Sequence, residues 1–203
     1  MLKLFSSKKT AQKKQQPIIV VSGLPRSGTS MMMKMLAEGG LQILTDAIRA
    51  ADEDNPNGYF EFERVKQMTA GDRAWLDEAG GKVVKVISAL LEYLPAGYSY
   101  KVIFMEREIR EVLASQKKML DHRGEQSKIG DAEMEEQYRA HLAAVKPWLA
   151  RQPNMDVLYV RYNAMMSDPA PLCGRVADFL DIPLNLEKML AVPSERLYRN
   201  RAK

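Results

Sequence analysis

A short apolar run, a glycine-bounded loop and a helical pattern follow one another near the start of the chain. Residues 17–22 (PIIVVS) are rich in β-branched side chains, which is typical of a strand buried on both faces. Residues 23–30 (GLPRSGTS) interrupt this run, and from Thr29 apolar residues recur at helical spacing until Gly39 and Gly40. The sequence therefore predicts a strand, a tight loop and a helix, and restricts the chain to folds in which a helix begins just beyond a buried strand.

Further strand-like runs alternate with helical patterns along the rest of the chain. This alternation is typical of a parallel sheet covered on both faces. The expected fold class is therefore α/β, with a P-loop-type parallel sheet flanked by helices in a single domain. We also expect Asp131 to cap the second of the later helices. The strand-like runs are 41–44, 83–87, 102–105 and 157–160, and the helical patterns are 110–120 and 131–150.

The first sixteen residues differ in charge from the rest of the chain. They hold five lysines and no acid, and since the whole chain has a formal net charge of +4, the remainder carries −1. A nucleic-acid-binding domain is expected to have a basic face of its own, so we expect no nucleic acid partner. Residues 1–16 are expected to form a disordered basic arm with at most weak contact to an anionic membrane surface, and residues 17–203 a single domain.

Cysteine and histidine are too scarce for the common metal centres. Cys173 is the single cysteine, so no internal disulfide is expected, and the two histidines are His122 and His141. No apolar stretch has the length of a secretion-signal core or of a membrane span. The sequence therefore predicts a cytoplasmic protein without a bound metal.

The loop at residues 23–30 has the features of an anion-binding turn. Gly23 and Gly28 allow backbone N–H groups to approach an anion, and the following helix directs further N–H groups and its dipole toward the same place. The loop is not a Walker A sequence, because Thr29 stands where a lysine would follow the second glycine. The cation is Arg26, inside the loop, and this placement suits a ligand with a single 5′-phosphate. Further hydroxyl donors are supplied by Ser27, Thr29 and Ser30.

These loop residues resemble the 5′-phosphosulfate loop of the sulfotransferase superfamily, in the version with arginine that Golgi and bacterial members carry. The resemblance runs from about residue 18 to residue 201. It implies 3′-phosphoadenosine 5′-phosphosulfate as the sulfuryl donor, 3′,5′-bisphosphoadenosine as the product, and metal-independent in-line transfer. The loop residues that it assigns to donor binding are Gly23, Pro25, Arg26, Ser27, Gly28, Thr29 and Ser30.

A second element after the run at 102–105 agrees with the same family. Family members place an arginine at the end of this strand and a serine eight residues later, and both bind the 3′-phosphate. Arg107 and Ser115 keep this spacing. Because eight residues are just over two helical turns, the two side chains can face one phosphate. The alternative is an exposed arginine and a solvated helix serine.

The resemblance implies further nucleotide contacts near the end of the chain. The sequence RYNAM around Tyr162 resembles the family's Tyr-Glu-Asp-Leu segment beside the adenine, which makes Tyr162 a candidate contact. Asn163 and Ala164 replace the acids that are usual there. The family ends with a basic loop over the 3′-phosphate, and Arg199 and Arg201 are expected in this role, against the alternative of a solvated basic tail.

Catalysis is assigned to Arg26, Lys85 and Glu61. Negative charge builds on the oxygen that leaves toward the 5′-phosphate, and the two cations are candidates to balance it. The acceptor also needs a base, and where cytosolic members carry a histidine this chain has Ile87. The run NPNGYFE, which ends at Glu61, resembles the bacterial Asn-Pro-x-Gly-Tyr-x-Glu motif, so Glu61 is the expected base. The alternative for Lys85 is a strand-end lysine that reaches solvent, and the alternative for Glu61 is an ordinary acid in the first turn of a helix.

Two other functions are compatible with the sequence. A P-loop kinase for small molecules would use Glu106 as its Mg²⁺-binding acid, although Arg107 and Thr29 count against it. A non-catalytic module would keep the nucleotide site and lack a working base. The acceptor is left open among small molecules, carbohydrates, lipids and peptides, and so is the oligomeric state.

Overall fold

The computed structural model describes residues 16–46, 58–127 and 129–193. Within this part of the chain the strands form a five-stranded sheet in the order β2-β3-β1-β4-β5, and every neighbouring pair is parallel. The α/β class and the single sheet are as predicted from the sequence. The strands are β1 (Ile18–Gly23), β2 (Ile43–Leu44), β3 (Val83–Lys85), β4 (Tyr100–Glu106) and β5 (Met155–Arg161).

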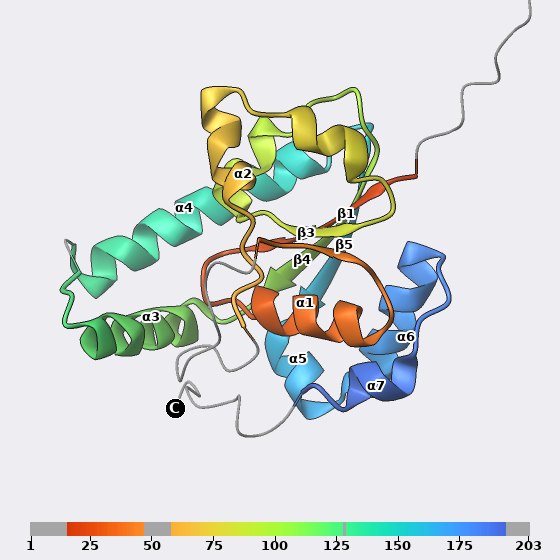
Figure 1. Cartoon of the computed structure of the whole chain (residues 1–203). Coiled ribbons are helices and arrows are strands. Elements are labelled where there is room, and N and C mark those ends of the chain that lie inside the picture. Colours follow the sequence, from red (N-terminus) through yellow and green to blue (C-terminus); the bar gives the residue numbers. More distant parts are fainter. Residues whose placement is uncertain (1–15, 47–57, 128, 194–203) are drawn as a thin grey trace, which may run out of the picture.

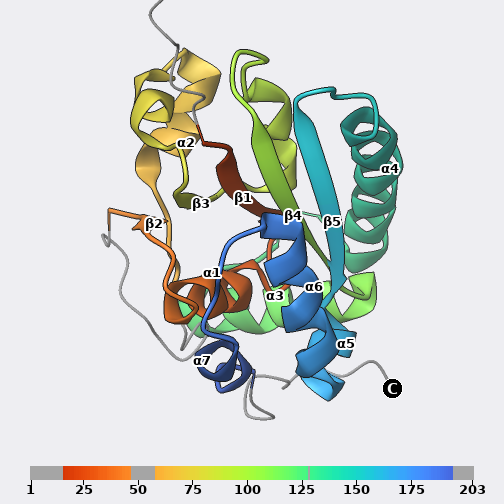
Figure 2. The ribbon, with the colours of Figure 1, turned by 90° about the vertical axis from the view of Figure 1, so that its right-hand side faces the viewer.

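Helices cover both faces of the sheet (Figures 1 and 2). One face packs against α1 (Thr29–Glu38), α5 (Tyr162–Ser167), α6 (Pro169–Leu180) and α7 (Leu186–Leu190). The other face packs against α2 (Glu63–Lys66), α4 (Asp131–Leu149) and the 3₁₀ helices η1 (Gln67–Ala70), η2 (Ala74–Glu78) and η3 (Ser88–Tyr93). The helix α3 (Ile109–Arg123) follows β4 and lies beside the first half of α4, away from the sheet (Figure 1). No helix in the described ranges has the length and apolarity needed to cross a membrane.

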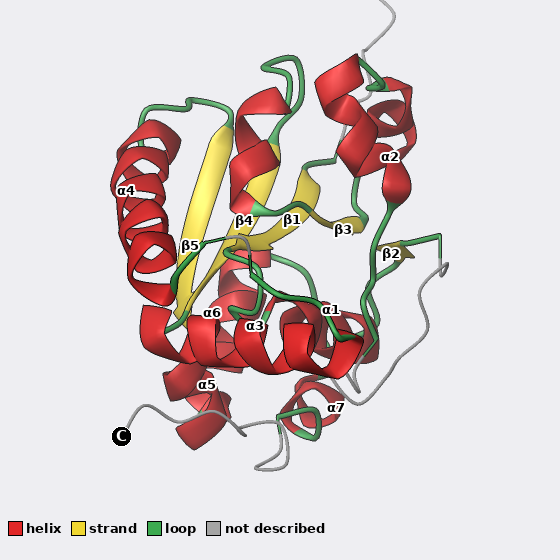
Figure 3. Ribbon diagram, turned by 90° about the vertical axis from the view of Figure 1, so that its left-hand side faces the viewer, coloured by secondary structure: helices red, strands yellow, loops and turns green. Residues whose placement is uncertain are grey.

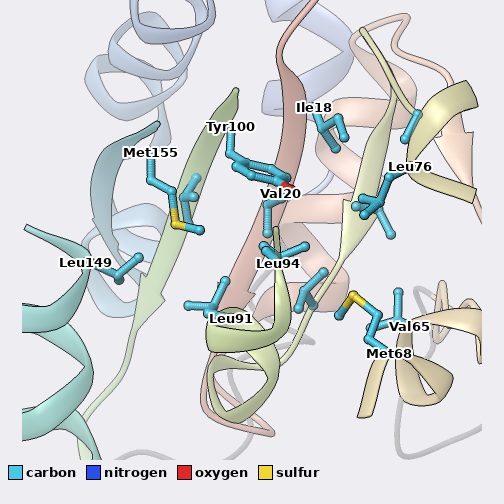
Figure 4. Packing of buried hydrophobic residues seen from close by; sticks show 14 of the residues in the cluster. Ile18, Val20, Val65, Met68, Leu76, Leu91, Leu94, Tyr100, Leu149 and Met155 are labelled. Carbon is cyan, nitrogen blue, oxygen red and sulfur yellow. The ribbon is translucent and has the colours of Figure 1, made fainter. Parts of the chain in front are cut away.

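The central strand β1 supplies side chains to both hydrophobic clusters. Ile18 and Val20 point into the cluster under α4 and the 3₁₀ helices, and Ile19 and Val21 point into the cluster under α1. Figure 4 shows the first cluster, which includes Val20 of β1 and Tyr100 of β4. All four β1 side chains are almost completely buried, and each contributes about 1.5–3 kcal/mol to folding. This two-sided burial explains why the run lacks the polar alternation of a surface strand.

The carboxyl ends of three adjacent strands meet at one edge of the sheet. Val21 of β1 is in register with Lys85 of β3, and Gly23 is in register with Met105 of β4. The chain leaving β1 runs toward β2 and β3, whereas the chain leaving β3 crosses to β4 on the other side, so strand order reverses beside β1 (Figure 3). Ligands of open α/β sheets bind at such a reversal, beyond the carboxyl ends of the strands.

Some element boundaries differ from those that the sequence predicts. The helix α3 is longer at both ends than the pattern at 110–120, and it ends where Gly124 takes a left-handed conformation (φ 65°). The cap of α4 is Gly130 and not Asp131, which is the first helical residue. The strand β3 ends at Lys85, since the chain turns there into η3 and leaves Ile87 39% exposed.

Candidate active site

The loop between β1 and α1 is built from unusual backbone conformations. Ser27 N donates to Leu24 O at 3.2 Å and closes a turn, with Pro25 at its second position and Arg26 at its third. Arg26 has a φ of 67°, which is uncommon for a residue with a side chain and fits the third position of a type II turn. Left-handed residues among right-handed ones direct successive N–H groups to one side, and such concave backbone segments bind anions.

Two glycines of the loop occupy positions where a side chain would be strained. A Cβ on Gly23 (φ 143°) would lie 2.6 Å from both Met105 O and Ser27 Oγ. A Cβ on Gly28 (φ 99°) would lie 2.4 Å from Cδ2 of Tyr162. Gly28 is also the N-cap of α1, so the tight contact fixes the place where the helix begins. The loop is therefore packed directly against β4 on one side and α5 on the other.

The loop side chains differ in their accessibility. Ser27 is 1% exposed, and its hydroxyl has no hydrogen-bond partner within the described ranges. A buried hydroxyl without a partner costs about 1–3 kcal/mol, so native structures retain few of them. Thr29 is buried at the first position of α1, Ser30 is half-buried, and Pro25 is exposed.

Arg26 connects the loop to helix α3. Its Nε donates to Oγ of Ser115 at 3.0 Å, although the two residues are 89 positions apart. Ser115 is itself 5% exposed. The structure thus places the loop cation against the serine that the sequence assigns to the 3′-phosphate end.

Arg107 is held on several sides. Its Nε donates to Oε2 of Glu111 at 3.0 Å, and its Nη1 donates to the carbonyl oxygen of Arg26 at 3.1 Å. Its guanidinium carbon lies 4.3 Å from the ring centroid of Tyr162, a distance at which the cation attracts the ring face. Oε1 of Glu111 in turn accepts from Nδ2 of Asn163 at 3.0 Å. We call Arg26, Arg107, Glu111, Ser115, Tyr162 and Asn163 the arginine network.

The arginine network brings together four residues that the sequence assigns to nucleotide binding, and adds two that it does not. Glu111 follows Arg107 at the i, i+4 spacing of helical ion pairs, which is a signal that sequence reasoning could have used. The sequence indicates Asn163 only as a departure from the family's acids, because its partner Glu111 lies 52 positions away.

The candidate catalytic residues Lys85 and Glu61 lie on the other side of β1. Nζ of Lys85 donates to the carbonyl oxygen of Tyr59. The backbone of Glu61 is held by the two residues that follow β2, since its carbonyl oxygen accepts from Thr45 Oγ1 at 2.9 Å and from Asp46 N at 3.2 Å. Oε2 of Glu61 lies 3.2 Å from Nζ of Lys66. We call Tyr59, Glu61, Lys66 and Lys85 the lysine–glutamate group.

A histidine that the sequence left without a role lies near the end of β3. Nε2 of His141, on α4, is 2.8 Å from Oγ of Ser88, the first residue of η3. Burial lowers the pKa of His141, and the carboxylate of Glu92 opposes part of this shift. Arg199 and Arg201 lie outside the described residues, and so do the asparagine and proline of the motif that ends at Glu61.

The sheet, the loop and the helix that follows define a P-loop-type α/β domain. The profile of the sulfotransferase domain family matches residues 16–200. The chain therefore belongs to the sulfotransferase domain family, whose members are transferases. No curated protein sequence matches the chain at a significant level.

Solved sulfotransferases share this fold. A sulfotransferase domain from the curacin biosynthetic pathway aligns with a TM-score of 0.54 and 16% identity, over 89% of this chain and 79% of that domain. Mouse sulfotransferase SULT7A1 complexed with PAP aligns with a TM-score of 0.54 and 16% identity, over 93% of this chain and 67% of that protein. A sulfotransferase from Alicyclobacillus acidocaldarius aligns with a TM-score of 0.54 and 15% identity, over 90% of this chain and 94% of that protein. Identities this low establish the shared fold alone.

Proposed function

We propose that this chain transfers the sulfuryl group of 3′-phosphoadenosine 5′-phosphosulfate to a hydroxyl or amine acceptor. Membership of the sulfotransferase domain family supports the reaction class. The observation that carries the choice of donor is the contact between the loop and α3. Arg26 touches both Ser115 and Arg107, so groups suited to a 5′-phosphate and groups suited to a 3′-phosphate are adjacent. A doubly phosphorylated adenosine requires this adjacency.

The residues of the loop fit the 5′-phosphate end of such a donor. The buried hydroxyl of Ser27, which has no hydrogen-bond partner among the described residues, can donate to an anion, and the glycines leave no side chain between the backbone and an anion. One of the structures with the same fold is described as complexed with PAP. The proposed donor-binding residues are Gly23, Pro25, Arg26, Ser27, Gly28, Thr29, Ser30, Arg107, Ser115, Tyr162, Arg199 and Arg201.

The chain's own groups would serve catalysis by position and charge. When bound, the donor supplies an activated sulfuryl group, and its leaving oxygen gains negative charge during transfer. Arg26, in the loop, and Lys85, at the carboxyl end of β3, would balance that charge, and Glu61 would accept the acceptor's proton. The contact of Lys85 with the backbone of Tyr59 ties this cation to the segment that carries Glu61. We propose the reaction as metal-independent, in the cytoplasm, by residues 17–203 acting as one domain.

The kinase alternative has less support from the geometry. A Mg²⁺-binding acid at the end of β4 would be Glu106, but Oε1 of Glu106 accepts from Nζ of Lys146 on α4. A lysine in this place competes with a metal ion for the carboxylate. A non-catalytic module would differ from the enzyme chiefly at Glu61.

Calorimetry with 3′,5′-bisphosphoadenosine in EDTA tests the proposed donor. We expect 1:1 binding without metal, and no binding of ATP with Mg²⁺ in its place. Binding of ATP that requires Mg²⁺, with no binding of the bisphosphate, would instead establish a kinase-like site.

Glu61→Gln separates the enzyme from a binding module. We expect unchanged affinity for 3′,5′-bisphosphoadenosine and a loss of about hundredfold or more in sulfuryl transfer, since general bases contribute 10²–10⁴-fold. Radiolabelled donor and a panel of phenol, sugar and amine acceptors provide the assay. Wild-type turnover in the variant would remove Glu61 from the role of base.

A further inference from the structure

Glu111 is a buried acid that the proposed reaction does not use. Its side chain is 2% exposed, and both of its carboxylate oxygens accept hydrogen bonds, from Arg107 Nε and from Asn163 Nδ2. A buried carboxylate is costly unless it is paired and hydrogen-bonded, and replacing a buried ion pair by apolar residues is often neutral or stabilising. The stability of α3 alone therefore does not explain why the chain keeps a charge here.

An ion pair of the same spacing on α4 shows what an ordinary helical pair looks like. Arg139 Nη2 lies 2.6 Å from Glu135 Oε1, with the two side chains 64% and 26% exposed. Such i, i+4 pairs contribute about 0.3–0.5 kcal/mol and position nothing beyond their own helix. The side chains of the Arg107–Glu111 pair are only 6% and 2% exposed. This pair instead connects the end of β4 with α3, and through Asn163 with α5.

Three contacts fix the orientation of the Arg107 guanidinium. Glu111 engages the Nε edge, the Arg26 carbonyl oxygen engages Nη1, and the ring of Tyr162 covers one face. The same ring meets Gly28, so the face contact is tied to the phosphate loop. The guanidinium is therefore oriented relative to the loop before any ligand arrives, which reduces the entropy lost when it binds a phosphate.

We propose that Glu111 and Asn163 are positioning residues that orient Arg107 toward the 3′-phosphate, and that they thereby determine the preference of the site for 3′-phosphorylated adenosine nucleotides. This inference rests on the proposed function. Asn163 suits the task because its amide donates to Glu111, whereas the acid usual in the resembling motif would place a second carboxylate against the first. The departure from the family pattern at position 163 is thus matched to the acid at 111.

Calorimetric titration with two nucleotides tests the inference. The probes are 3′,5′-bisphosphoadenosine and 5′-AMP, which differ by the 3′-phosphate, and the measured quantity is the ratio of their affinities. For Glu111→Gln we expect the affinity for the bisphosphate to fall about tenfold or more, as for one impaired charge-assisted contact, and that for 5′-AMP to change less than about twofold. For Asn163→Ala, which keeps both charges, we expect the same selective loss at about threefold. Glu135→Gln is the matched control, with an unchanged ratio.

The outcomes distinguish this inference from the function on which it rests. A wild-type protein that binds both nucleotides equally would remove the proposed donor. A wild type that prefers the bisphosphate, with Glu111→Gln and Asn163→Ala preserving that ratio, would leave the function standing and overturn the positioning role. Equal weakening of both nucleotides would assign Glu111 a structural role only, and this also overturns the inference. If Glu111→Gln does not fold, Asn163→Ala decides on the same criterion.

Discussion

The arginine network and the lysine–glutamate group lie on opposite sides of β1 and are held in different ways. In the first, an ion pair with side chains 6% and 2% exposed connects α3 to the end of β4. In the second, the pair of Lys66 and Glu61 has side chains 56% and 27% exposed, and hydrogen bonds from the two residues after β2 to the Glu61 carbonyl oxygen hold the segment. The arginine network is therefore preorganised by buried charges, whereas the lysine–glutamate group, which contains the candidate base, depends on contacts to its backbone and a solvated pair. A buried network tolerates loss of one member far less well than an exposed one does.

The largest loss of stability is expected from truncating Arg107, the cation of the buried ion pair. Arg107→Ala leaves the charge of Glu111 buried without its counterion, which typically costs about 3–5 kcal/mol. Urea unfolding measures the loss. The double variant Arg107→Met with Glu111→Gln should recover most of the stability, because neither charge then stays behind. A loss below about 1 kcal/mol in the single variant would show that water reaches the pair, and would cancel the contrast between the two regions.

A somewhat smaller effect is expected where the loop between β1 and α1 meets Tyr162. Gly28→Ala adds a Cβ 2.4 Å from the buried ring at a left-handed φ, whereas Gly124→Ala adds one at a left-handed φ with no atom within 4 Å. Both variants should lose about 1–2 kcal/mol from backbone strain, and Gly28→Ala a further 1–3 kcal/mol, about the usual cost of overpacking. Thermal unfolding of the two variants measures the difference. Equal losses would mean that the loop shifts to accommodate the added Cβ, contrary to a preorganised arginine network.

Truncation of the exposed cation should matter least among the charge variants. Lys66→Ala removes contacts to Glu61 and Glu63 that are exposed to solvent, and such pairs contribute about 0–1 kcal/mol. We expect its urea unfolding curve to lie close to that of the wild type, with unchanged affinity for 3′,5′-bisphosphoadenosine. A loss comparable to that of Arg107→Ala would show that the lysine–glutamate group is as strongly coupled to the fold as the arginine network.

The smallest effect is a pH dependence at His141, which belongs to neither region. Because burial lowers the pKa of His141, folding favours its neutral form. This contribution to stability is present above the ordinary histidine pKa of about 6.5 and is lost as the pH falls toward the lower value of the folded state. His141→Gln should therefore decline less in unfolding free energy than the wild type between pH 7 and pH 5. A steeper decline in the variant would contradict the direction of the shift.

The fold was predictable because its signals are local. The strand, loop and helix at the start of the chain have the bounds that the sequence indicates to within a residue, since two-sided burial and glycine conformations act over a few positions. The end of α3 was less predictable, because polar residues up to Arg123 continue the helix without an apolar pattern. The predicted cap of α4 was wrong by one residue for a related reason. An acid fits the first helical turn as well as the cap itself.

By itself, the amino-acid sequence determined the order of strands and helices and the bounds of the loop between β1 and α1, because periodicity and backbone preference are properties of neighbours along the chain. Only the tertiary structure decided which side chains meet at the carboxyl edge of the sheet. The contacts of Arg26 with Ser115 and of Glu111 with Asn163 join positions 89 and 52 apart, and they depend on how parallel strands and their helices pack. A buried charge has to find its partner in space, and no local pattern records which distant residue that partner is.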